Sequence, residues 1–86
     1  MSYHVVIKKQ AEKKLKNMPA YLRNLIAEKI YMLSQNPTDP RLEVKKLVGE
    51  PFYRMRVGDW RVIFDKQEKI KVISIEKIKP RGDVYK

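Results

Sequence analysis

Arg54, Arg56 and Arg61 are the residues in this sequence best suited to chemistry, because guanidinium groups bind phosphates through paired hydrogen bonds. The segment between them, Val57–Trp60, reads VGDW. A glycine that opens a two-residue loop is typical of a type II′ hairpin turn. The arginines are therefore predicted to lie on the two strands of one hairpin, close to its turn.

The position of this turn also predicts the register of the hairpin. Counting outward from the loop gives five cross-strand pairs: Val57 with Trp60, Arg56 with Arg61, Met55 with Val62, Arg54 with Ile63, and Tyr53 with Phe64. Side chains alternate between the two faces of a strand, so one face is apolar and the other carries all three arginines. Like charges directly opposite each other destabilise a sheet, which favours a role in binding an anion. The alternative is a solvated face whose arginines extend into water or pair with Glu76 or Asp59.

The rest of the chain contains the elements that position this hairpin. Apolar residues at spacings of three and four predict a helix over residues 20–35, with the stripe Leu22, Leu25, Ile26, Ile30 and Leu33. Four strands are expected, two in the hairpin at residues 52–57 and 60–65 and two more at 3–7 and 70–78. A short helix is expected at 8–17, and a loop or short extended piece at 41–50. The predicted fold class is α+β: an N-terminal strand and a two-helix hairpin packed on one face of an antiparallel sheet of about four strands.

Composition limits the class of protein. The chain has 86 residues, 20 Lys plus Arg against 10 Asp plus Glu, and a formal charge of +10. This length predicts a single domain over residues 1–86, and the charge favours a polyanionic partner. There is no cysteine and only one histidine, His4, so no cofactor or metal site is expected. The N-terminus does not resemble a signal peptide and no apolar run reaches membrane-spanning length, so we expect a cytoplasmic protein without membrane contacts.

Three segments together resemble the RelE/ParE toxin superfamily. These are KLVG at residues 46–49, FYRMRVGDWRVIF at 52–64 and RGDVY at 81–85. The resemblance extends over the whole chain, and its central motif is long and fairly specific. It implies the toxin of a type II toxin–antitoxin system, of the RelE type, which enters the ribosomal A site and cleaves mRNA there. The 2′-hydroxyl of the RNA is the nucleophile in that reaction, and no metal is needed.

The resemblance also implies roles for individual residues. The implied catalytic residues are Arg54, Arg56, Arg61, Arg81 and Tyr85, and the implied RNA-binding residues are Lys45, Lys46 and Lys79. Arg61 and Arg81 would stabilise the charge that develops on the phosphate, and Tyr85 would stack on a base or exchange a proton. Lys79 takes the place of Arg81 if the tail aligns differently. Implied partners are an acidic antitoxin, forming a hetero-oligomer with the toxin, and the ribosome with its mRNA.

The general base is not identified by the sequence, because arginine stays protonated and makes a poor base. Candidate bases are Lys45, Lys46, Lys79, Glu76 and Tyr85. Two other functions remain open at this point: a ParE-type toxin that binds DNA gyrase without being an enzyme, and a basic module that binds RNA without cutting it.

Overall fold

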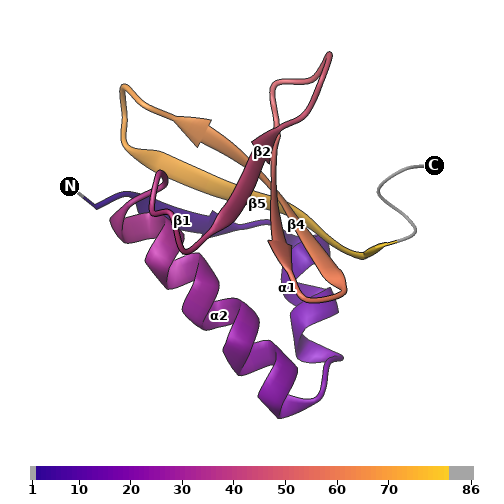
Figure 1. The fold of residues 1–86 in the computed structure, drawn as a ribbon. Coiled ribbons are helices and arrows are strands. Elements are labelled where there is room, and N and C mark those ends of the chain that lie inside the picture. The colour runs from indigo at the N-terminus through magenta and orange to yellow at the C-terminus, as the bar shows by residue number, and fades with distance from the viewer. Residues whose placement is uncertain (1, 82–86) are drawn as a thin grey trace.

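The computed structural model describes residues 2–81, which form one five-stranded sheet with two helices on one side of it (Figure 1). The elements follow in the order β1 (His4–Ile7), α1 (Lys9–Lys16), α2 (Ala20–Gln35), β2 (Glu43–Lys46), β3 (Tyr53–Val57), β4 (Trp60–Gln67) and β5 (Val72–Pro80). The strands lie side by side in the order β1-β5-β4-β3-β2. The predicted α+β class, with its N-terminal strand and helix pair, is confirmed.

The sheet differs from the predicted one in two respects. Residues 43–46, expected to lie in a loop or short extended piece, form the edge strand β2. The first strand, β1, pairs with β5 in the parallel direction, so the sheet is mixed rather than wholly antiparallel. A chain that leaves β1 and passes through two helices before it re-enters the sheet can return in either direction, and strand propensity alone does not select one.

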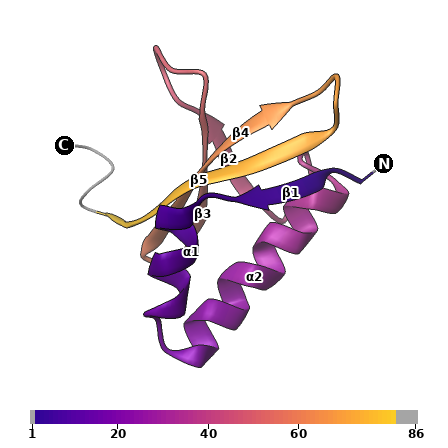
Figure 2. The ribbon, with the colours of Figure 1, turned by 180° about the vertical axis from the view of Figure 1, so that it is seen from behind.

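Helix α2 begins after Pro19, whose carbonyl accepts the backbone N–H groups of Leu22 and Arg23. Its apolar stripe packs on the sheet, with Ile26, Ile30 and Leu33 buried, whereas Leu25 is 40% exposed. Both views of the molecule show α1 and α2 on the same side of the sheet (Figures 1 and 2). The core lies between these helices and the facing side chains of β3, β4 and β5: Met55, Val57, Val62, Phe64, Ile73, Ile75 and Ile78.

The β3–β4 hairpin has the register expected from its turn. All five predicted pairs are present, from Tyr53 opposite Phe64 to Val57 opposite Trp60. Gly58 has φ +57°, and Asp59 does not share this left-handed conformation. A positive φ at the first loop residue alone is the pattern of a type II′ turn. The two faces therefore separate as expected, with the apolar side chains toward the helices.

A β-bulge interrupts the pairing of β4 with β5. Ile63 pairs with Lys77 and Phe64 pairs with Ile75, so Glu76 is an extra residue in β5. Because side chains alternate along a strand, the extra residue is what lets Ile75 face the core while Lys77 and Lys79 face the opposite side. The bulge therefore determines which β5 side chains reach the face that carries the arginines.

Candidate nucleic-acid interface

The distal face, defined here as the sheet face that points away from α1 and α2, carries most of the predicted site residues. Side chains of directly paired residues share a face. One row of pairs runs across four strands, namely Glu43, Arg56, Arg61 and Lys79, and is called the Arg61 row below. A second row, called the Ile63 row, consists of Lys45, Arg54, Ile63 and Lys77. Six of these eight side chains are cationic and one is acidic.

Arg61 is the most enclosed charged residue of the distal face. It is only 3% exposed, and its Nη1 donates to the carbonyl oxygens of Gly58 and Trp60, both at 3.0 Å. Its Nε lies buried with no hydrogen-bond partner among the described residues. No carboxylate within residues 2–81 forms an ion pair with this guanidinium at 4.0 Å or less. A buried cation with only carbonyl partners is costly, so this position favours an incoming anion.

Arg54 and Arg56 extend the positive charge from Arg61 toward the sheet edge. Together with Lys45 and Glu43 they line a hollow of about 360 Å³ on the β2 side of the sheet. Arg56 is exposed and Arg54 is half-buried. The three arginines therefore differ in burial, with Arg56 exposed, Arg54 half-buried and Arg61 buried, and an elongated anion crossing the strands would meet them in turn.

On the other side of Arg61, β5 supplies Lys79 and Lys77. Lys79 is paired directly with Arg61, so it lies next to that arginine on the distal face. Lys77, which sequence reasoning did not select, lies beside it on the same face. Both lysines share this face because side chains alternate along β5, while the bulge at Glu76 returns Ile75 to the core. Arg81 is exposed just beyond β5, where its backbone N–H donates to the Asp59 carbonyl at 2.9 Å.

Two predicted residues are not placed in this cluster. Lys46 pairs with Tyr53, so it belongs to the opposite face; its Nζ lies 5.4 Å from the centre of the Tyr53 ring and donates to the Glu50 carbonyl. The prediction for Lys46 as an RNA-binding residue thus loses its geometric support at the arginine cluster. Tyr85 lies outside the described residues, so its implied role stays a prediction.

Carboxylates on the distal face lie mainly beyond the bulge. Glu76 accepts a hydrogen bond from Ser74 Oγ at 2.8 Å, and Asp65 accepts one from Gln67 at 3.0 Å. Glu43 differs because it stands within the Arg61 row, directly across from Arg56. The Asp59 and Glu76 side chains form no ion pair with the arginines within residues 2–81.

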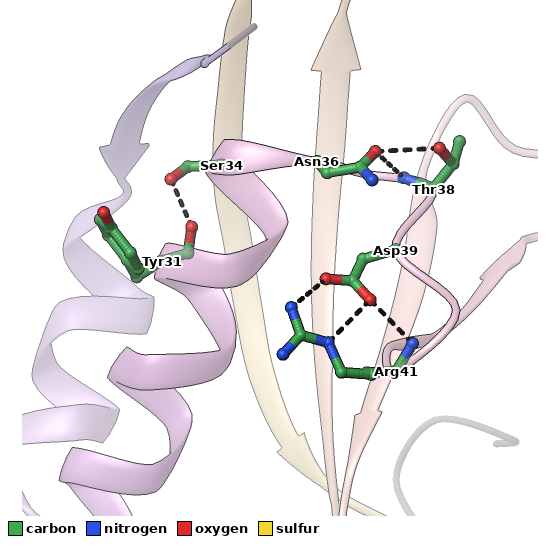
Figure 3. Close-up of polar contacts among 6 residues, drawn as sticks. All are labelled: Tyr31, Ser34, Asn36, Thr38, Asp39 and Arg41. Atoms are coloured by element: carbon green, nitrogen blue, oxygen red, sulfur yellow. Dashed lines mark hydrogen bonds and ion pairs between the residues drawn. The ribbon is translucent and has the colours of Figure 1, made fainter.

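The edge strand β2 is positioned by the loop that follows α2 (Figure 3). Asn36 Oδ1 accepts the backbone N–H and the hydroxyl of Thr38, at 3.1 and 2.9 Å. Asp39 accepts the Nε, Nη2 and backbone N–H of Arg41, at 3.1, 2.7 and 2.9 Å. These bonds, the side-chain bond from Arg41 above all, lower the pKa of Asp39 from 3.8 to about 2. The carboxylate is thus held ionised four residues before the chain enters β2 at Glu43.

Other kinds of site find little support in the described part of the chain. No three His, Asp or Glu side chains within residues 2–81 are grouped so that they could hold a metal ion. No helix among these residues has the length and apolar character needed to cross a membrane. Among the described residues, the distal face with its two cationic rows is therefore the best candidate for a binding site.

Residues 5–85 match the family model described as the ParE toxin of the type II toxin–antitoxin system parDE. A curated relative from Methanocaldococcus jannaschii, named as a RelE1 toxin, is 33% identical over 88 aligned positions that cover 100% of this chain and 98% of its own length. The chain is similar to one chain in the crystal structure of the archaeal RelE–RelB complex from Pyrococcus horikoshii. The TM-score is 0.83 and the identity 40%, and the match covers 95% of this chain and 98% of that chain. For the RelB–RelE complex of Methanococcus jannaschii the TM-score is 0.75 and the identity 25%, covering 93% and 94% of the two chains.

Proposed function

The chain belongs to the RelE/ParE family of toxins from type II toxin–antitoxin systems, and we propose that it is a ribosome-dependent endonuclease that cuts mRNA in the ribosomal A site. The observation that carries this proposal is the Arg61 row, in which Arg56, Arg61 and Lys79 stand side by side on one face. Cleavage of a phosphodiester builds negative charge on the phosphoryl oxygens. Preorganised cations stabilise that charge, and the two guanidinium groups among them stay protonated at neutral pH.

The fold supplies this preorganisation through its backbone. Arg61 is held by two carbonyl bonds at the hairpin turn, and the same turn accepts the N–H of Arg81 through Asp59. Arg54, in the neighbouring row, would position the RNA backbone on the β3 side. The RNA supplies the nucleophile in the form of its own 2′-hydroxyl group. Tyr85 remains our candidate for stacking on an unpaired base, a common mode of single-stranded RNA recognition.

We further propose an acidic antitoxin as the physiological partner. The solved relatives from Pyrococcus horikoshii and Methanococcus jannaschii are complexes of RelE with RelB. A net charge of +10 on 86 residues gives an acidic protein strong complementarity to this surface. Co-expression with an acidic antitoxin of the RelB kind should restore growth and yield a co-purifying complex. Failure of both would contradict the partner assignment.

The test of the proposed activity is primer extension on a reporter mRNA in a purified translation system, with and without ribosomes. We expect cuts within codons that require ribosomes and disappear with Arg61→Ala. Arg23→Ala is the matched control, since Arg23 lies on α2 and donates to the backbone carbonyl of Met18 at 3.5 Å. Intact mRNA in the presence of a wild-type sample that arrests growth would contradict the proposal.

A second candidate is a ParE-type toxin that poisons DNA gyrase, and the description of the matching family model favours it. In that case the distal face would be incidental to toxicity. Gyrase-dependent DNA cleavage complexes formed while mRNA stays whole would select this function. Salt-sensitive RNA binding with neither effect would instead indicate a non-catalytic RNA-binding module.

A further inference from the structure

The Arg61 row has an order that suits acid–base chemistry. Its four side chains lie across neighbouring strands as a carboxylate (Glu43), two guanidinium groups (Arg56 and Arg61) and an ammonium group (Lys79). Each strand is about 4.8 Å from the next, so the backbones at the two ends are roughly 14 Å apart. The long side chains of glutamate and lysine can close that span over a phosphate held by the two arginines between them.

Attack of a 2′-hydroxyl on the adjacent phosphorus needs three functions in line. A proton acceptor must stand at the attacking oxygen, cations at the phosphoryl oxygens, and a proton donor at the leaving 5′-oxygen. Arginine cannot accept the proton because it remains charged, and lysine has no free lone pair while it is an ammonium ion. Within the row, only the Glu43 carboxylate can accept it.

We propose that Glu43 is the general base and Lys79 the general acid of the cleavage reaction, an inference that rests on the proposed function. The 2′-hydroxyl passes its proton to the Glu43 carboxylate as the O2′–P bond forms. The P–O5′ bond breaks, and the leaving 5′-oxygen takes a proton from the Lys79 ammonium group. The products are a 2′,3′-cyclic phosphate and a 5′-hydroxyl, and no co-reactant is consumed.

The surroundings of the carboxylates favour Glu43 over the alternatives. Glu76 is already bonded to Ser74 Oγ, and Asp65 is bonded to Gln67. Both lie on the far side of Ile63 from the Arg61 row. Glu43 is exposed, lines the hollow beside Arg54 and Arg56, and forms no ion pair at 4.0 Å or less within residues 2–81. It is therefore available to a substrate that enters this hollow.

The first experiment measures single-turnover cleavage of a short synthetic mRNA on purified ribosomes. We expect Glu43→Gln, which keeps the shape of the side chain, to slow cleavage by about 10²- to 10⁴-fold while ribosome binding is retained. Its rate should then rise in proportion to hydroxide concentration, because hydroxide replaces the missing base. Glu50→Gln, in the exposed loop between β2 and β3, is the matched control and should cut at the wild-type rate.

The second experiment tests Lys79 with a substrate that carries sulfur in place of the 5′-bridging oxygen at the scissile link. A thiolate leaves without being protonated, since thiols are far more acidic than alcohols. Lys79→Ala should therefore cut the normal substrate slowly and the sulfur substrate nearly as fast as the wild type does. Glu43→Gln should stay slow on both substrates.

The outcomes separate this inference from the proposed function. If wild-type protein leaves mRNA whole on ribosomes, the proposed function fails and the inference fails with it. If the wild type cuts and Glu43→Gln cuts equally well, the acid–base assignment alone is overturned. A loss confined to Glu76→Gln, or no sulfur rescue of Lys79→Ala, would overturn it as well.

Discussion

Arg61 combines deep burial with few polar partners among the described residues. The residue is only 3% exposed, and its Nη1 donates hydrogen bonds to two backbone carbonyl oxygens. Its Nε has no hydrogen-bond partner in the described part of the chain. Moving a cation out of water costs free energy that carbonyl groups recover only in part. A structural arginine is usually matched by a carboxylate, so this environment supports our proposal that Arg61 binds a phosphate.

This interpretation predicts that Arg61→Met separates activity from stability. Cleavage should fall by at least about 10²-fold, as for the loss of one preorganised donor in other active sites. The free energy of unfolding should change by less than about 1 kcal/mol, because the desolvation that is relieved offsets the two hydrogen bonds that are lost. Urea denaturation and primer extension on the same samples make the comparison, with Arg23→Met as the control that keeps activity. A destabilisation of about 3 kcal/mol or more would instead indicate a structural arginine.

Residue positions on the distal face were predictable only where a turn fixes the register. The glycine at position 58 pins the β3–β4 hairpin, so the faces of Arg54, Arg56 and Arg61 followed from counting along the strands. Lys46 was predicted to bind RNA beside them, yet its pairing with Tyr53 puts it on the opposite face. Nothing in its local sequence shows this, because the register of β2 depends on a longer loop.

At the scale of elements, β2 is the strand on which the proposed chemistry depends and the one with the weakest sequence signal. Its four residues, EVKK, contain a single apolar side chain, Val44, so an alternating pattern is barely present. The conformation of the loop before β2 is fixed by hydrogen bonds between the Arg41 and Asp39 side chains (Figure 3). Because Arg41 lies two residues before Glu43, the conformation of this loop helps to position Glu43 on the distal face.

Loss of the Asp39 charge should destabilise the protein in a pH-dependent way. The pKa of Asp39 is about 2 in the folded chain, below the value near 3.9 of an unfolded chain. A lowered folded-state pKa means that the stabilisation is fully present above about pH 5 and is lost as pH falls through the folded-state pKa of about 2. We therefore expect the melting temperature of Asp39→Asn to lie below that of the wild type at pH 6, with the gap narrowing at pH 4 and again at pH 3. Arg41→Gln should show the same narrowing, whereas a gap that does not vary with pH would refute the role of this charge.

The strand limits and pairing that sequence reasoning missed share a physical cause. Strand β4 runs to Gln67 and the following turn lies at residues 68–71, with Lys71 at φ 55°. Lysine has no preference for that conformation, so the sequence did not indicate that β4 extends beyond residue 65, where this strand was expected to end. The parallel pairing of β1 with β5 joins residues almost seventy positions apart, and such contacts form through the packed core and not through local pattern.

At the scale of the whole molecule, the fold gives the sheet one apolar face and one cationic face. The helices bury the apolar face of the sheet, and the distal face collects Lys45, Arg54, Arg56, Arg61, Lys77 and Lys79. Other cations lie elsewhere, for example Lys69 in the turn between β4 and β5. If the net charge alone drew RNA to the protein, all exposed cations would count equally. If the distal face binds RNA, only the cations on that face should contribute to RNA binding.

Two variants of equal net charge distinguish these cases. For single-stranded RNA, the logarithm of the binding constant falls linearly with the logarithm of salt concentration, with a slope of about −0.7 for each phosphate neutralised. Arg56→Gln removes a cation from the Arg61 row, so we expect its slope to become shallower by about 0.7. Lys69→Gln removes the same charge at an exposed turn and should leave the slope unchanged. Fluorescence anisotropy of a labelled RNA between about 50 and about 200 mM salt measures both slopes. Equal slopes for the two variants would show that RNA binding follows net charge and not the distal face.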